Sequence, residues 1–124
     1  MTFSPEWNTA YENGQRRSWK MSADLNYLLD TFIGPLIGQR ILEFGCGVGN
    51  NSDVITGSGG IYFGIDGSQS AIDEAKFHHL GEFACCDFTI SQPFGDEFDV
   101  VIDRAAIAHN DTAGIKRAIN LIWR

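Results

Sequence analysis

The chain has 124 residues, of which 44% are hydrophobic and 20% are charged, and its formal net charge is −7. These proportions are typical of a soluble globular protein, and the length fits one domain over residues 1–124. The acidic balance argues against a general nucleic-acid surface. No apolar run is long enough to span a bilayer and no signal peptide opens the chain, so we expect a cytoplasmic protein without nucleic-acid or membrane partners.

Residues 1–38 are expected to form an N-terminal helical arm. Trp7 and Tyr11 are four residues apart and therefore share one face of a helix, and Trp19 follows them. These aromatic side chains either pack the arm onto the rest of the protein or form a lid over a ligand. Apolar residues at helical spacing predict a second helix over residues 21–33.

A glycine-rich stretch follows at residues 40–52. It begins with a short apolar run and ends in polar residues suited to a helix start, so it predicts a strand, a tight loop and a helix N-terminus. Because glycine lacks a Cβ atom, such a loop lets the backbone approach a ligand closely, and the N–H groups of the helix start point at that ligand. The glycines of the loop are Gly45, Gly47 and Gly49.

The spacing of these glycines distinguishes between two kinds of ligand. A dinucleotide site has the pattern G-x-G-x-x-G, but Asn50 stands where its third glycine would be. Glu43, just before the loop, is unfavourable beside a diphosphate and suits a cationic or hydroxyl-bearing ligand better. Cys46 lies between the first two glycines and is expected to matter for its small size, since the sequence offers no base partner for a catalytic thiol.

Three further strands are expected after the loop, and they alternate with helices. Asp66 follows the second strand, where an acidic side chain can accept hydrogen bonds from ribose hydroxyls or cap the next helix. The near-continuous apolar run of the fourth strand is typical of a sheet that is buried on both faces. The expected strands cover residues 61–65, 82–86 and 97–103, and the expected helices begin at residue 52, cover residues 69–79 and follow a cap at residues 111–112.

In open α/β sheets, ligands bind beyond the carboxyl ends of the strands. Asp103 and Arg104 end the fourth strand, so we expect them to face the same crevice as the glycine loop and Asp66. His109 follows within reach, either as a general base or as a surface or capping residue. The three cysteines are odd in number and two are adjacent, which favours free thiols, and the cysteines and histidines show no zinc spacing, so we expect no metal site.

Several of these stretches resemble motifs of the class I S-adenosylmethionine-dependent methyltransferases. The resemblance lies in E-x-G-x-G-x-G from Glu43, in residues 64–75, in the Asp-Phe pair after the third strand and in residues 98–105. The aromatic pattern of the arm is similar to the thiopurine- and tellurite-type branch of that family. The resemblance implies an α/β, Rossmann-like and mostly parallel sheet with flanking helices over residues 39–124, corresponding to the front half of a typical seven-stranded member.

The resemblance also implies S-adenosyl-L-methionine as the cofactor, a small-molecule substrate and a set of site residues. The implied cofactor-binding residues of the loop region are Glu43, Gly45, Cys46, Gly47, Gly49 and Asn50. Those at the ribose and adenine are Asp66, Gly67, Ser68, Asp87 and Phe88, and those of the closing arm are Trp7, Tyr11 and Trp19. The implied substrate-side residues are Asp103, Arg104 and His109.

Two other functions stay open. The first is a truncated protein that binds the cofactor without turnover, because the strands that usually complete the substrate pocket are not among the four that the sequence predicts. The second is a nicotinamide-dependent oxidoreductase, which the glycine spacing disfavours. The fourth strand would lie at an edge of the sheet, which proteins normally cover or pair, so we expect either strands from elsewhere or a homodimer through this edge.

Overall fold

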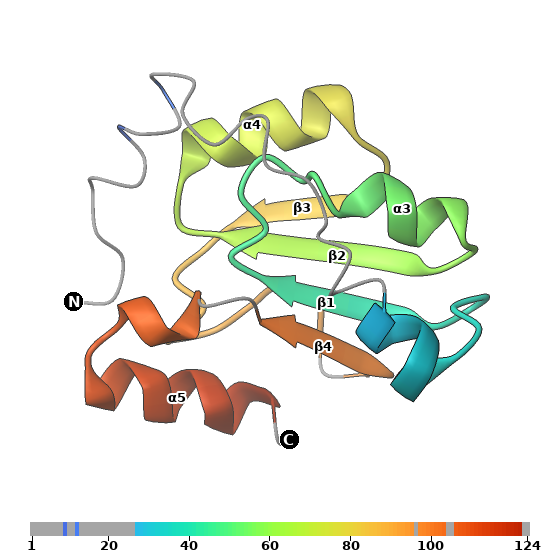
Figure 1. The fold of residues 1–124 in the computed structure, drawn as a ribbon. Coiled ribbons are helices and arrows are strands. Elements are labelled where there is room, and N and C mark those ends of the chain that lie inside the picture. The colour runs from blue at the N-terminus through green and yellow to red at the C-terminus, as the bar shows by residue number, and fades with distance from the viewer. Residues whose placement is uncertain (1–8, 10–11, 13–26, 96, 104–105, 123–124) are drawn as a thin grey trace.

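The computed structural model describes Thr9, Glu12 and residues 27–95, 97–103 and 106–122 (Figure 1). Its centre is a four-stranded sheet in the order β3-β2-β1-β4, and every pair of neighbouring strands is parallel. The expected α/β fold with a Rossmann-like, mostly parallel sheet is therefore confirmed. The strands are β1 (Arg40–Phe44), β2 (Ile61–Asp66), β3 (Glu82–Cys85) and β4 (Val100–Asp103).

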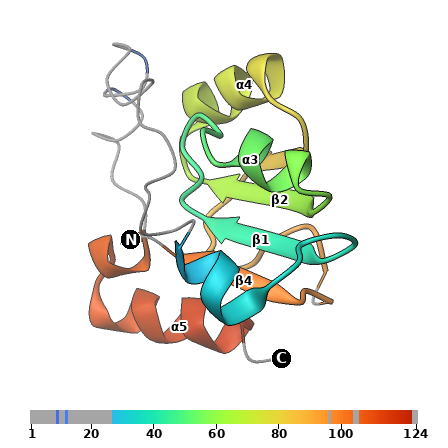
Figure 2. The same ribbon diagram turned by 45° about the vertical axis from the view of Figure 1, so that its right-hand side comes forward.

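Helices cover both faces of this sheet. Figures 1 and 2 show α3 and α4 on the opposite side of the sheet from α5. The helical segments are the π-helical turn η1 (Leu29–Ile33), α3 (Ser52–Gly57), α4 (Gln69–His78), the 3-10 turn η2 (Ile107–His109) and α5 (Thr112–Ile122). Of the helix expected over residues 21–33, residues 21–26 lie outside the described part of the chain. Its end at Ile33 is as predicted, and the backbone N–H of the following Gly34, with φ 81°, donates to Leu29 O at 3.0 Å.

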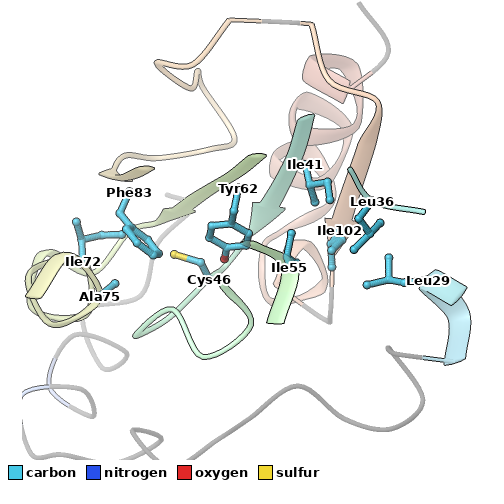
Figure 3. Close-up of a cluster of buried hydrophobic side chains, with 10 residues drawn as sticks. All are labelled: Leu29, Leu36, Ile41, Cys46, Ile55, Tyr62, Ile72, Ala75, Phe83 and Ile102. Carbon is cyan, nitrogen blue, oxygen red and sulfur yellow. The ribbon is translucent and has the colours of Figure 1, made fainter. Parts of the chain in front are cut away.

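Alternation of side chains along the strands gives the protein two cores. Ile41 and Tyr62 point to the face under α3 and α4, whereas Leu42 and Phe44 point to the face under α5. Because both faces are covered, apolar residues fill most positions of the strands, and charged residues stand at or next to strand ends. The buried cluster on the α3/α4 face contains Leu29, Leu36, Ile41, Cys46, Ile55, Tyr62, Ile72, Ala75, Phe83 and Ile102 (Figure 3).

The start of β4 differs from the prediction. The sequence predicts a strand from residue 97, but the strand begins at Val100. Before it, the Asp99 carboxylate accepts the backbone N–H of Arg40 at 2.7 Å, and the Arg40 side chain donates to Glu97 O at 2.6 Å. The backbone N–H of Asp99 also donates to Arg40 O at 2.9 Å, so backbone and side-chain bonds together hold the two segments just before the strand begins. The turn η2 is a further difference, since the sequence predicts no helical turn at residues 107–109.

Within the described residues, β4 is paired only on its β1 side and forms one edge of the sheet. A homodimer through this edge, and the division into an arm over residues 1–38 and a core over residues 39–124, stay predictions. No helix in the described part of the chain is long and apolar enough to cross a membrane.

Candidate functional site

The strand register brings the predicted site segments to one edge of the sheet. Phe44 at the end of β1 lies opposite Ile65 of β2 and Asp103 of β4, and Asp66 lies opposite Cys85 of β3. Because all the strands are parallel, the loops that follow β1, β2, β3 and β4 leave the sheet on the same side. The glycine loop, the Asp66 segment and the Asp103 segment therefore meet where ligands of open α/β sheets bind.

The glycine loop has the backbone conformation that the alternating glycines predict. Gly45, Gly47 and Gly49 have φ values of 70°, 58° and 83°, in the left-handed region that other residues rarely adopt. The backbone N–H groups of Gly45 and Cys46 both donate to Ile65 O, at 2.8 and 3.0 Å, which holds the loop against the end of β2. Gly45 is required to be glycine for a second reason, because a Cβ atom there would lie 2.3 Å from the Cβ atom of Ala106.

Asp66 connects this loop to the start of α4. The side chain is 6% exposed, and its two oxygens accept the backbone N–H of Gly47 at 3.0 Å and that of Ser68 at 2.9 Å. Burial raises the pKa of Asp66, while the hydrogen bonds from the backbone N–H groups of Ser68, Gly47 and Gly67 oppose this increase. Since each carboxylate oxygen can accept more than one hydrogen bond, Asp66 keeps acceptor capacity that fits the hydroxyls of a ribose.

The neighbouring Ser68 has a clear local role. Its side-chain oxygen accepts the backbone N–H of Ala71 at 3.1 Å and so caps α4. Gly67 lies between Asp66 and this cap and is partly exposed. Residues 66–68 are thus fixed at both ends, because Asp66 is bonded to the loop after β1 and Ser68 caps α4.

Glu43 lies behind the loop rather than at its outer surface. It is 3% exposed and points to the α3/α4 face, where its oxygens accept hydrogen bonds from Asn51 Nδ2 at 2.6 Å and from the Tyr62 hydroxyl. Asn51 and Tyr62 are not among the residues predicted from the sequence. The sequence signals for them are a polar side chain at a helix start and a hydroxyl within a largely apolar strand. Pairing Tyr62 with Glu43 requires the strand register, and pairing Asn51 with Glu43 requires the conformation of the loop.

Cys46 packs closely against β2. The residue is 8% exposed, and a Cβ atom on Gly64 would lie 2.9 Å from both its Cβ and its Sγ. Burial raises the pKa of the Cys46 thiol well above its usual value, and the carboxylates of Asp66 and Glu43 raise it further. A buried thiol of this kind supports packing rather than nucleophilic chemistry, in agreement with the expectation that its size matters most.

The segment after β3 contains the residues predicted to contact adenine. Asp87 Oδ1 accepts hydrogen bonds from the backbone N–H of Thr89 at 3.0 Å and from the Thr89 hydroxyl at 2.5 Å. Phe88 is 8% exposed and stacks on Phe44, with ring centroids 5.2 Å apart, in the core under α5. Phe88 therefore anchors this segment to β1, and its contact with an adenine ring stays a prediction.

On the substrate side, Asp103 is exposed and one of its oxygens accepts the backbone N–H groups of Ala106 and Ile107, both at 3.0 Å. This bonding starts the turn η2, which ends at the exposed His109. Arg104 and the aromatic residues of the predicted lid, Trp7, Tyr11 and Trp19, lie outside the described residues. Among the described residues, no cluster of three or more His, Cys, Asp or Glu side chains could hold a metal ion.

Curated relatives match part of the chain. A ubiquinone biosynthesis O-methyltransferase of Coxiella burnetii is 32% identical over 79 residues, which is 60% of this chain and 34% of that protein. A protein of the same name from Pelagibacter ubique is 30% identical over 79 residues, 60% of this chain and 33% of its own length. Each match thus spans about a third of the curated relative.

Solved structures share the fold over most of the chain. A TehB-like SAM-dependent methyltransferase from Corynebacterium glutamicum has a TM-score of 0.72 at 22% identity and covers 97% of this chain and 62% of its own. Magnesium protoporphyrin IX methyltransferase from Synechocystis, with bound SAM, has a TM-score of 0.65 at 20% identity, covering 93% and 52%. A putative Zn-dependent alcohol dehydrogenase from Rhodobacter sphaeroides has a TM-score of 0.73 at 19% identity, covering 98% and 50%. At these identities the likeness shows the fold alone.

The family model described as a methyltransferase domain matches residues 41–124, from β1 to the end of the chain. The matched region contains the glycine loop, Asp66, Asp87 and Asp103, which the strand register brings to one edge of the sheet. On this match, which covers more than half of the chain, the protein belongs to the methyltransferase domain family.

Proposed function

We propose that this chain is the cofactor-binding part of an S-adenosyl-L-methionine-dependent methyltransferase that acts on a small molecule. The observation that carries the proposal is the hydrogen bond between Gly47 and the buried Asp66 carboxylate at the carboxyl edge of the sheet. It joins a glycine loop without the dinucleotide spacing to an acidic residue suited to ribose hydroxyls. S-adenosyl-L-methionine is the cofactor that suits both features together with the family match.

In this proposal the residues of the chain bind and orient, and they do little covalent chemistry. When bound, the cofactor supplies a methyl group on a positively charged sulfur. The backbone of the loop from Gly45 to Asn50 would surround its amino-acid end, Asp66 would accept hydrogen bonds from the ribose hydroxyls, and Asp87 would accept one from the adenine amino group. Methyl transfer by in-line displacement depends mainly on alignment and on exclusion of water, so such binding groups account for much of the catalysis.

The substrate class rests on two observations. The curated relatives are named O-methyltransferases of ubiquinone biosynthesis, which supports a small molecule with a hydroxyl acceptor. The net charge of −7 is unfavourable for a nucleic-acid substrate. Asp103 and His109, both exposed at the carboxyl edge, are the described candidates for contact with that acceptor, and Arg104 is a third. A position in the thiopurine- and tellurite-type branch belongs to the proposal as well, on the sequence pattern of the N-terminal arm.

Calorimetric titration of the purified chain with S-adenosylhomocysteine, beside a titration with NAD, tests the cofactor assignment. We expect saturable binding of S-adenosylhomocysteine, at least about tenfold weaker in Asp66→Ala because the ribose loses a charged acceptor. Asp73→Ala is the matched control, since Asp73 is exposed on α4, bonds Gln69 of the same helix and carries the same charge. Preferred binding of NAD would overturn the proposal and support the oxidoreductase alternative.

A second assay separates an active enzyme from a protein that only binds the cofactor. The chain is incubated with S-adenosylmethionine labelled in its methyl group and with a series of hydroxylated aromatic acceptors. Transfer of label that depends on the acceptor supports the enzyme. Cofactor binding without any transfer supports the truncated, catalytically inactive alternative.

A further inference from the structure

A small polar cluster lies behind the glycine loop, within the apolar core under α3 and α4. It consists of Glu43, Asn51 and Tyr62, which are 3%, 8% and 1% exposed. Figure 3 shows Tyr62 among the apolar side chains of this core. A buried carboxylate is unfavourable unless hydrogen bonds compensate for its lost hydration, so a cluster of this kind requires an explanation.

The positions of the three residues relate the cluster to the loop. Glu43 is the second-last residue of β1 and Asn51 directly precedes α3, so the two residues flank the loop on either side. The 2.6 Å hydrogen bond from Asn51 Nδ2 to Glu43 therefore joins the two ends of the loop. Tyr62, on β2, donates its hydroxyl to the other oxygen of the same carboxylate.

Asn51 makes this bond instead of capping the helix that follows it. It occupies the cap position before α3, where an asparagine side chain normally accepts a backbone N–H of the first turn. Here the Asn51 side chain makes no such capping bond, and its amide points to Glu43. The side chain therefore stabilises the loop rather than the start of the helix.

The cluster also complements the bonds on the other side of the loop. Gly47 is held by Asp66, and Gly45 and Cys46 are held by Ile65 O. Those bonds hold the first part of the loop, whereas the bond between Glu43 and Asn51 holds its end. Burial, and then the Glu43 carboxylate, raise the pKa of Tyr62 well above its usual value, so that its hydroxyl remains a proton donor.

We propose that Glu43, Asn51 and Tyr62 are positioning residues that hold the glycine loop in the conformation that receives the cofactor. They set cofactor affinity from behind the loop, through its backbone, and none of the three side chains has to touch the ligand. This inference rests on the proposed function for the identity of the ligand, but the positioning of the loop is a property of the protein without ligand.

A swap of charged and neutral partners tests the inference. Asn51→Asp places two carboxylates face to face, and we expect S-adenosylhomocysteine to bind at least about tenfold more weakly. Loss of helix capping would not explain this result, because aspartate is as good a capping residue as asparagine. In the double variant Glu43→Gln, Asn51→Asp, the amide introduced at position 43 donates to the carboxylate introduced at position 51, and the amide oxygen still accepts from Tyr62. Binding should then return to within about threefold of the original protein.

Hydrogen–deuterium exchange of the protein without ligand is the second measurement that tests the inference. We expect faster exchange in residues 45–50 of Asn51→Asp, unchanged exchange in β3, and recovery in the double variant. Faster exchange throughout the sheet, or a double variant no better than the single one, would overturn the inference and leave only a structural role. If the original protein does not bind S-adenosylhomocysteine, the proposed function fails, and the exchange pattern alone then decides whether the cluster positions the loop.

Discussion

Gly47 donates its backbone N–H to the Asp66 carboxylate over 3.0 Å, so the residue proposed to bind the ribose also holds the loop proposed to bind the other end of the cofactor. The two proposed parts of the site come from different βα connections, and one buried side chain joins them. Because that carboxylate is buried, its charged form is disfavoured, and its pKa is raised from the ordinary value of 3.8. The charge on this carboxylate, which the proposed function uses, therefore lowers the stability of the fold at neutral pH.

The first prediction follows from this pKa. With a raised pKa, the folded state retains the Asp66 proton more tightly than the unfolded state does. The stability gained from this tighter proton binding is fully present below pH 3.8, the ordinary pKa of aspartate. It is lost as the pH rises through the folded-state pKa. Asp66→Asn has no such loss, so the stability of the variant relative to the original protein should increase from acid to neutral pH, while S-adenosylhomocysteine affinity falls at least about tenfold.

Urea unfolding at a series of pH values, followed by circular dichroism, measures this difference. Asp73→Asn serves as the control, since Asp73 is exposed and lies outside the site. A stability difference between Asp66→Asn and the original protein that does not change with pH would contradict the role given to the buried charge.

The second prediction concerns Gly45. An alanine there would have to adopt φ 70° and would place its Cβ atom 2.3 Å from that of Ala106. The conformation costs about 1–2 kcal/mol and the overlap about 1–3 kcal/mol more, so we expect Gly45→Ala to lose about 2–5 kcal/mol of unfolding free energy. The overlap would also push the segment that leads to η2 away from the loop.

Gly38→Ala separates these two costs. Gly38 has a similar φ of 73°, but nothing lies within 4 Å of the Cβ position. We therefore expect this variant to lose only about 1–2 kcal/mol in the same denaturation experiment. Equal losses in the two variants would mean that the contact with Ala106 has no energetic weight.

Much of the fold could be predicted from the sequence because its signals are local. Short apolar runs alternate with segments whose apolar residues have helical spacing, and this pattern predicts each strand to within three residues at either end. Gly45, Gly47 and Gly49 are each separated by one residue, which predicts the loop conformation. The start of β4 could not be predicted, since the contacts of Asp99 just before it are made with Arg40, which is distant in the sequence. The cluster behind the loop was missed for the same reason, because Tyr62 and Glu43 meet only through the strand register.

The third prediction concerns Gly64 in the middle of β2. A Cβ atom at this position would lie 2.9 Å from Cys46 Cβ and Sγ and 3.0 Å from the Phe83 ring. We expect Gly64→Ala to destabilise the protein by about 1–3 kcal/mol, because neither neighbour can move without disturbing the core or the loop. Gly57→Ala, at the end of α3 with nothing within 4 Å, should instead be neutral or stabilising by up to about 1 kcal/mol. Thermal unfolding compares the two, and a Gly64→Ala protein as stable as Gly57→Ala would refute the predicted contact.

The fourth prediction concerns the cap of α5. Asp111 Oδ1 accepts the backbone N–H of Gly114 at 2.7 Å, which confirms the helix start predicted at residues 111–112. Asp111→Ala removes this bond and should cost about 1 kcal/mol of unfolding free energy, whereas Asp111→Ser keeps a side-chain acceptor and should retain most of the stability. Because α5 covers one face of the sheet through Ala118 and directly follows η2, a weakened cap should also increase hydrogen–deuterium exchange at residues 107–114 before it affects β1. Equal destabilisation by serine and alanine would contradict a capping role for this hydrogen bond.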